Sequence, residues 1–363
     1  MVDWSNLPED LLNLIAGRLF SVIELKRFRS ICRSWRSSVP GASNNNPFRR
    51  RPLIHLNPYP KKPLINRRQR GEFLSRSAFF RVTLSSSPSQ GWLIKSDKDI
   101  NSGKFHLLEP LSRLPLRHSC ARVDLLEFTI TEIREAYEVH DCRTRRETRP
   151  RFKRVVLVKD KEGDNRVLGI LCTGKMKYWK IKTWKTKKKS YEFSDIIVHK
   201  GRLTYALDSI GIVYWIRSDL KVIRFGPPVG DNITNGCSGE RSLVECSGEL
   251  YIVDRLEENS RKRKADTVYA DAKTVSFKVY KFDDEQGKMI EVKSLGDKAF
   301  VMATDTCFSV LAHEFYGCLQ NSIYFTEDKE IKVFKLDNGN GSSIETMSKF
   351  PQSCFQMFVP SFL

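Results

Sequence analysis

Two stretches of the chain hold an acid near a histidine, the pairing that general acid–base catalysis uses. Asp195, His199 and Asp208 form the first stretch, and the second runs from Asp305 to His313. No Gly-x-Ser-x-Gly nucleophile motif, no phosphate-binding Gly-x-x-x-x-Gly-Lys and no His-Glu-x-x-His accompanies them. In strand-rich sequence such acids mostly serve turns and the surface. The pattern therefore predicts a protein that is not an enzyme.

Thiol and imidazole groups, which hold zinc in many proteins, are spread widely along the chain. The cysteines are odd in number and include no Cys-x-x-Cys pair, so neither a disulfide framework nor a local zinc site is predicted. His140 and Cys142 stand two residues apart, which is half a metal site at best and fits a strand edge better. We expect no metal and no cofactor. The nine cysteines are Cys32, Cys120, Cys142, Cys172, Cys237, Cys246, Cys307, Cys318 and Cys354.

Lysine and arginine give the chain a net charge of +19, and they are concentrated in two segments. Residues 141–189 hold 18 basic and 5 acidic side chains, and residues 46–80 hold 9 and 1. A basic surface attracts nucleic acid, acidic proteins or anionic lipid without distinguishing them. Aromatic residues interleave with the lysines at Tyr178, Trp179 and Trp184, as in a base-stacking strip or in a half-buried strand.

A further basic cluster, Arg261-Lys262-Arg263-Lys264, lies in a polar insertion at residues 257–272. Such a cluster is compatible with nuclear import and equally with a solvated loop. The first residues include no basic and apolar leader of a secretory signal, and no apolar run reaches the length of a membrane span. These features predict a location in the nucleus, the cytoplasm or both, and no association with a membrane.

Residues 3–40 carry the spacing of three short helices. Pro8 suits the first position of a helix, and the acidic residues that follow complement the positive end of the helix dipole. Apolar residues recur along that helix at positions i, i+4 and i+8. Ser21 is a plausible break before a second helix, and a third short helix carries three more apolar residues. The apolar positions of the first and third helices are Leu7, Leu11, Ile15, Leu19, Ile31, Cys32 and Trp35.

A module of fewer than about 40 residues seldom buries enough surface to be stable alone. The large apolar residues of this segment exceed what three short helices can hide, so we expect an exposed apolar patch that binds a partner. Packing against the rest of the chain is the alternative explanation. The following segment, 41–70, is rich in proline and arginine and is predicted to be a linker.

Residues 71–363 read as many short strands joined by turns. A unit of turn, strand, turn and alternating strand begins at Gly201, Gly248 and Asn321, which are 47 and 73 residues apart. A hairpin recurring at this interval is typical of propeller blades, and a β-sandwich is the alternative. The predicted fold class is therefore α+β and multidomain, with a helical module followed by a mostly-β domain that is a propeller.

The N-terminal spacing resembles that of an F-box. In that family the three-helix module docks a Skp-family adaptor, which connects it to a cullin-RING ubiquitin ligase. The rest of the chain is similar to the SKIP-twenty-three-like group of plant F-box proteins, whose C-terminal domain is propeller-like. The F-box positions matched are Leu7, Pro8, Leu11, Ile15, Leu19, Ile31, Cys32 and Trp35. The similar stretches of the second part are residues 71–76, 91–95, 107–115, 294–301 and 318–325.

The resemblance implies the substrate-recognition subunit of a Skp–cullin–F-box ubiquitin ligase, which catalyses nothing itself and recruits an unknown protein target. Two other functions stay open at this point. One is nucleic-acid binding by the basic segment 143–189, and the other is an F-box module that works outside a ligase. A basic face of the β domain could also recruit an acidic target.

Overall fold

The computed structural model comprises two compact units, residues 1–55 and 56–363, and each is described by itself. The structure describes residues 7–18, 28–38, 55–56, 72–85, 87–98, 105–112, 128–141, 152–161, 165–180, 183–186, 191–201, 203–226, 239–258, 273–283, 286–328, 330–336, 344–346 and 356–357. No helix among these residues has the length and apolar character needed to cross a membrane.

The first helix of the N-terminal unit, α1, spans Glu9–Arg18. The carbonyl of Pro8 accepts hydrogen bonds from the amides of Leu11 and Leu12 at 3.1 Å each, so Pro8 caps the helix from outside. The prediction that Pro8 is the first helical residue was wrong by one position. Asp10 follows Glu9 in the first turn, where both negative charges face the positive end of the helix dipole.

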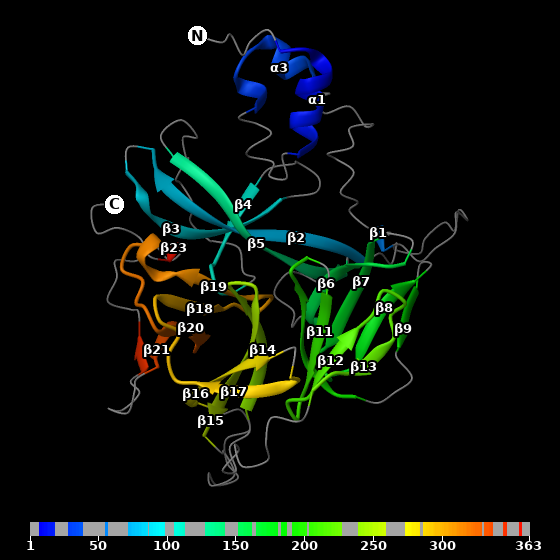
Figure 1. Cartoon of the computed structure of the whole chain (residues 1–363), viewed down its shortest axis with the longest axis vertical. Coiled ribbons are helices and arrows are strands. Elements are labelled where there is room, and N and C mark those ends of the chain that lie inside the picture. The colour runs from blue at the N-terminus through cyan, green and yellow to red at the C-terminus, as the bar shows by residue number, and fades with distance from the viewer. Residues whose placement is uncertain are drawn as a thin grey trace, which may run out of the picture. The chain divides into compact units, whose positions relative to one another are not determined.

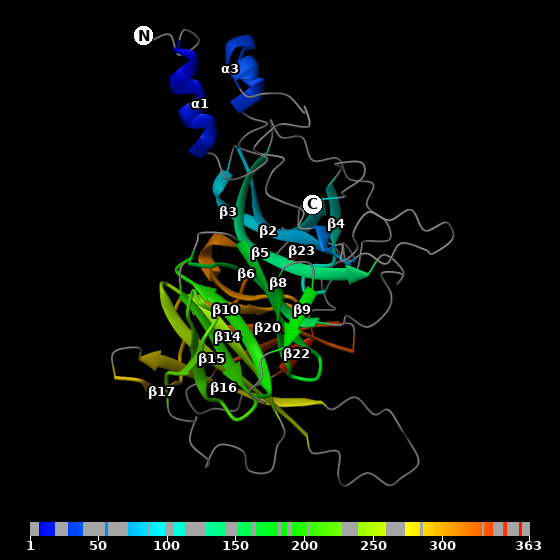
Figure 2. The same cartoon turned by 90° about the vertical axis from the view of Figure 1, so that its right-hand side faces the viewer.

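The last helix of this unit, α3, spans Arg33–Ser38 and lies beside α1 (Figure 2). Cys32 precedes it and accepts a hydrogen bond from the amide of Arg36 at 3.1 Å. Ile31 lies in a bend before Cys32. Both residues were predicted to lie on the third helix, and both lie just before it. Residues 28–30 are helical, whereas Ser21 and the rest of the predicted middle helix fall outside the described residues.

The second unit contains five antiparallel-rich sheets arranged around a common centre (Figure 1), which confirms the predicted propeller. Sheet 1 holds β1 (His55–Leu56), β2 (Glu72–Leu84), β3 (Ser87–Lys98), β4 (Phe105–Leu108), β5 (Phe128–Asp141) and β23 (Gln356–Met357). Sheet 2 holds β6 (Phe152–Lys159), β7 (Asn165–Leu171), β8 (Met176–Lys180) and β9 (Thr183–Thr186). Sheet 3 holds β10 (Phe193–His199), β11 (Leu203–Asp208), β12 (Val213–Ile216) and β13 (Val222–Arg224).

Sheet 4 holds β14 (Gly239–Cys246), β15 (Glu249–Glu257), β16 (Thr274–Asp283) and β17 (Lys288–Val292). Sheet 5 holds β18 (Lys298–Met302), β19 (Cys307–Leu311), β20 (Ser322–Glu327), β21 (Glu330–Lys335) and β22 (Ile344–Thr346), with the 3-10 helix η4 (Ala312–Glu314) before β20. Sheet 5 departs from the simple blade because β18 pairs in parallel with β20. The inner strands β6, β10, β14 and β19 are neighbours around the centre.

The repeat that predicted the propeller marks left-handed turn positions. Gly201, Gly248 and Asn321 have φ angles of 65°, 76° and 54°. Ser247 and Gly248 form the two-residue link between β14 and β15, where Cys246 pairs with Glu249. Both link residues have positive φ, as the turn that matches strand twist requires. The turn residues therefore recur because Gly201 and Gly248 each join the first two strands of a sheet, whereas Asn321 leads into β20 of sheet 5.

The hydrophobic core lies between adjacent sheets rather than at the centre of the ring. One cluster joins sheets 2 and 3 through Ile170, Phe193 and Ala206, and another joins sheets 3 and 4 through Tyr205 and Phe282. Similar clusters lie between sheets 4 and 5 and between sheets 5 and 1. Because side chains along a strand point alternately to the two faces of its sheet, sheets 3, 4 and 5 each pack apolar residues against both neighbours.

The C-terminal end of the chain returns to sheet 1. There β23 pairs with β3, with Met357 opposite Leu93 and Gln356 opposite Ile94. Sheet 5 is also tied to β3 because the amide of Tyr316 donates to the carbonyl of Gly91 at 3.0 Å. A Cβ at Gly91 would lie 2.4 Å from the carbonyl oxygen of Val82, so this position requires glycine. These contacts close the ring between its first and last sheets.

Candidate functional site

The interior of the N-terminal unit is very small. Leu12 of α1 and Phe28 are buried, and Leu7, Ile15 and Trp35 pack partly buried against them. The rings of Phe28 and Trp35 are 4.5 Å apart between centroids. The predicted docking residues Leu7, Ile15 and Trp35 therefore also support the fold of this unit.

Two large apolar residues of this unit project into solvent. Leu11 is 48% exposed and Ile31 is 57% exposed. Leu11 faces outward because it is the helical neighbour of Leu12, which fills the interior. Pro8 is exposed and Cys32 is half-buried, with its sulfur 3.0 Å from the hydroxyl of Ser34. Leu19, also predicted to dock the adaptor, falls outside the described residues.

These exposures sort the predicted docking residues into two groups. Pro8, Leu11 and Ile31 are open to a partner, and the other described ones are shared between the interior and the surface. An apolar partner surface would cover Leu11 and Ile31, and each fully covered side chain of this size is worth about 2 kcal/mol. The chemistry that this unit offers is hydrophobic association.

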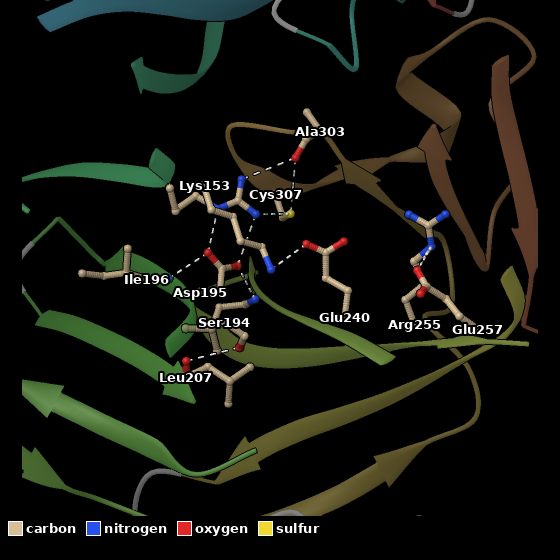
Figure 3. Close-up of polar contacts among 12 residues, drawn as sticks. Lys153, Ser194, Asp195, Ile196, Leu207, Glu240, Arg255, Glu257, Ala303 and Cys307 are labelled. Carbon is tan, nitrogen blue, oxygen red and sulfur yellow. Dashed lines mark hydrogen bonds and ion pairs between the residues drawn. The ribbon is translucent and has the colours of Figure 1, made fainter. Parts of the chain in front are cut away.

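At the centre of the propeller, polar groups replace the apolar core (Figure 3). Arg154 of β6 donates from Nε to Asp195 of β10 at 2.6 Å, and both side chains are almost fully buried. Asp195 also accepts the amide of Leu243 in β14 at 2.8 Å. The guanidinium reaches Cys307 at 3.3 Å and the carbonyl of Ala303 at 3.4 Å. This Arg154–Asp195 hub therefore connects sheets 2, 3, 4 and 5.

Electrostatics keep the hub in one protonation state. Burial opposes the charge of Arg154, but the carboxylate of Asp195 outweighs it and raises the pKa of the guanidinium above its usual value. Burial raises the pKa of the Cys307 thiol to about 11, although Arg154 acts in the opposite direction. Cys307 is therefore a neutral thiol at physiological pH, and the hub is a structural ion pair.

A second buried ion pair joins sheet 1 to sheet 5. The ammonium of Lys95 lies 2.7 Å from a carboxylate oxygen of Asp305, and Lys95 is fully buried. Lys95 also donates to the carbonyl of Ser112 at 2.6 Å and lies 5.0 Å from the ring centroid of Phe79. All three donor directions of a buried ammonium need partners, and these contacts supply them.

One end of the central region carries mixed charge near the hub. Lys153 pairs with Glu240 at 2.7 Å, and Arg255 pairs with Glu257 at 3.7 Å (Figure 3). Burial favours the neutral form of Glu240, but Lys153 outweighs this and lowers its pKa, whereas burial raises the pKa of Glu257. Arg255 also binds Glu327 of sheet 5 at 3.2 Å. These residues therefore bridge sheets 2, 4 and 5.

The acid–histidine stretches do not converge on one site. Asp195 belongs to the hub, and Asp208 accepts the amide of Ile212 at 2.8 Å and the hydroxyl of Tyr214 at 2.9 Å. His199 Nδ1 lies 3.6 Å from Glu245. Asp208 serves a turn as predicted, but the prediction that such acids lie on the surface was wrong, because all three residues of the first stretch are buried. No cluster of three possible metal-ligating side chains occurs among the described residues.

Comparison with known proteins identifies the architecture. The KIB1-4 beta-propeller family matches residues 70–337, which is more than half of the chain. The chain belongs to this plant family of F-box proteins with a β-propeller. Two Arabidopsis thaliana relatives named as F-box proteins, At1g65770 and At1g65740, are 78% and 57% identical over the full length of both chains. The F-box protein SKIP23 of the same organism is 29% identical, with 97% of this chain and 93% of the relative covered.

Sequence reasoning named Asp195 but missed its pairing with Arg154 at the centre of this F-box propeller. Arg154 and Asp195 are 41 residues apart, and Arg154 and Cys307 are 153 apart. Residues so far apart in the sequence form no local pattern from which their contact could be predicted. The signal available was the charge itself, since an arginine and an aspartate within apolar strand sequence need partners when they are buried.

Proposed function

We propose that this chain is the substrate-recognition subunit of a Skp–cullin–F-box ubiquitin ligase. Its F-box would dock a Skp-family adaptor, and its propeller would hold a protein target for ubiquitination. The main support for this proposal is the apolar surface of the F-box, where Leu11 and Ile31 are exposed in the chain by itself. Membership of the F-box family supports this role.

Docking through the F-box would raise the local concentration of target lysines near the ubiquitin carrier, to about the millimolar range for a short connection. The propeller needs no catalytic group for this role, because tethering alone accelerates the transfer. We expect the purified full chain to bind a purified Skp-family adaptor and the double variant Leu11→Glu, Ile31→Glu to lose that binding. Equal adaptor affinity of the two proteins would contradict the proposed docking surface.

We also propose that the chain enters the nucleus through Arg261-Lys262-Arg263-Lys264, which lies outside the described residues. The support is the sequence pattern of four consecutive basic residues. Replacing all four with alanine should move a fluorescent fusion from the nucleus to the cytoplasm. An unchanged distribution would contradict a role of this cluster in import.

A further inference from the structure

Positive charge is unequally shared among the propeller sheets. From Phe152 to Thr186, the segment of sheet 2 contains ten basic and three acidic residues, and all three acids stand between β6 and β7 in the sequence. Sheet 5, from Lys298 to Thr346, carries four basic and seven acidic residues. Sheet 4, from Gly239 to Val292, carries ten and twelve. Sheet 2 is therefore a strongly basic blade in a propeller whose sheets 4 and 5 are acidic.

Some basic residues of sheet 2 form ion pairs within the propeller, and others do not. Near its inner strand, Arg154 pairs with Asp195, Lys153 pairs with Glu240, and Arg166 pairs with Asp160 at 2.6 Å. On the outer side, Lys175 is exposed and Lys177 is half-buried, and neither forms an ion pair within the described part of the chain. The basic residues outside these ion pairs are therefore Lys159 and Lys161, which are exposed at the end of β6, and the lysines from Lys175 onward.

The outer hairpin of sheet 2 consists of β8 and β9 and lies at the margin of the propeller (Figure 1). From Lys175 to Lys189 the sequence contains eight lysines and no acidic residue. In the ladder, Trp179 pairs with Trp184 and Tyr178 pairs with Lys185. β9 is the last strand of its sheet, so one edge of its backbone is unpaired within the described residues. An edge strand of this kind can accept an extended segment of another chain.

We propose that the β8–β9 hairpin binds an acidic, extended segment of the protein target. Lysines along the hairpin would meet carboxylates or phosphates of that segment, and the β9 edge would align its backbone. Strand addition by a distant segment already occurs in this molecule, because β23 joins the edge of β3. This inference rests on the proposed function, since it names the chemistry of the target that the ligase would recruit.

The packing of Tyr178 favours a protein segment over nucleic acid. A single-stranded nucleic acid would use aromatic rings as stacking platforms. Tyr178 is half-buried against the apolar cluster between sheets 2 and 3, so this ring supports the core. Tyr178, one of the three aromatic residues that suggested a base-stacking strip, is therefore part of the packed interior of the propeller.

The test compares two sets of three charge reversals in the full chain. The hairpin variant is Lys175→Glu, Lys180→Glu, Lys185→Glu. The matched control is Lys273→Glu, Lys288→Glu, Lys293→Glu, three exposed lysines in or beside the outer strands of sheet 4. Binding of a short fluorescent glutamate-rich peptide is measured by anisotropy at low ionic strength. An oligothymidine of the same length is measured in parallel, and thermal unfolding confirms that both variants are folded.

We expect the hairpin variant to bind the acidic peptide about tenfold more weakly or worse, and the control to stay within about twofold of the natural chain. Equal losses in the two variants, or no peptide binding by the natural chain, would overturn the proposal. Tighter binding of oligothymidine than of peptide, lost in the hairpin variant, would overturn it in favour of a nucleic-acid site.

Adaptor binding by the same three proteins separates this inference from the proposed function. Both variants should bind a purified Skp-family adaptor as the natural chain does, because neither changes the F-box. If none binds the adaptor while only the hairpin variant loses the peptide, the ligase role fails and the acidic-segment site stands. If all bind the adaptor and lose the peptide equally, the site fails and the ligase role stands.

Discussion

The F-box and the propeller differ in the kinds of side chain that they bury. Among its described apolar residues, the F-box fully buries only Leu12 and Phe28 and leaves Leu11 and Ile31 exposed. The propeller packs apolar clusters between neighbouring sheets and also encloses charge, in the Arg154–Asp195 hub and the Lys95–Asp305 pair. Apolar side chains that stay exposed are available to a partner, whereas the charges of the hub and of the Lys95–Asp305 pair already have partners inside the propeller. This difference is what the proposed function would use, with docking at the F-box and target recognition at the propeller.

The largest effect should come from the hub. Asp195→Ala would leave the guanidinium of Arg154 buried without its carboxylate, which costs about 3–5 kcal/mol. The free energy of unfolding of the propeller, measured by urea denaturation, should fall by that amount. The matched control is Asp219→Ala in the turn between β12 and β13, where the amide of Lys221 and nearby cations lower the pKa of a half-buried carboxyl outside the hub. Equal stability of the Asp195 and Asp219 variants would show that the hub does not stabilise the ring.

The interior of the F-box gives the next effect. Phe28→Ala removes one of the two buried apolar side chains in the described part of the F-box, together with its ring contact with Trp35, and such truncations cost about 3–5 kcal/mol. This module has little interior to compensate, so the helices should lose protection from proteolysis while the propeller keeps its thermal unfolding midpoint. A simultaneous loss of both units would contradict their independence.

The helices of the F-box and the strands and turns of the propeller can be predicted from the sequence. The contacts inside each unit cannot. The i, i+4 spacing of Leu11 and Ile15 predicts α1 because helix periodicity is local, and the turn glycines predict blades because backbone handedness is local. Cap positions at Pro8 and Cys32 shifted by one residue because several nearby positions can start a helix. The hub escaped prediction because Arg154 and Asp195 meet only after two sheets have formed.

A smaller effect is expected at the junction of sheets 4 and 5. Burial opposes ionisation of Glu327, but hydrogen bonds from Lys332 and Thr274 outweigh it and hold its pKa at about 2. The stabilisation by this carboxylate is therefore present above its unfolded pKa of about 4.3 and is lost as the pH falls from there to about 2.

The variant Glu327→Gln tests this junction. It should be less stable than the natural chain at pH 7, by about 1–3 kcal/mol, because Lys332 loses its charged partner. The difference between the two proteins should shrink as the pH falls below about 4.3. A difference that is constant from pH 7 to pH 2, measured by urea denaturation, would contradict the lowered pKa.

The smallest effect concerns thiol accessibility within the propeller. Cys172 is exposed, whereas Cys307 is buried in the hub and its pKa is raised to about 11. Mass spectrometry after brief alkylation of the native chain should therefore find Cys172 modified and Cys307 protected. Modification of Cys307 at a rate similar to Cys172 would mean that the centre of the ring opens readily.

The most direct test of the account is the affinity of the full chain for a purified Skp-family adaptor, measured by calorimetry with two matched variants. The account predicts that Leu11→Glu, Ile31→Glu loses about 2 kcal/mol or more of binding free energy. The control Ile223→Glu, Ile290→Glu, which changes two exposed isoleucines of the propeller, should bind as the natural chain does. Unchanged adaptor affinity of the Leu11 and Ile31 variant, with the module still folded, would contradict the assignment of the F-box surface and with it the proposed ligase role.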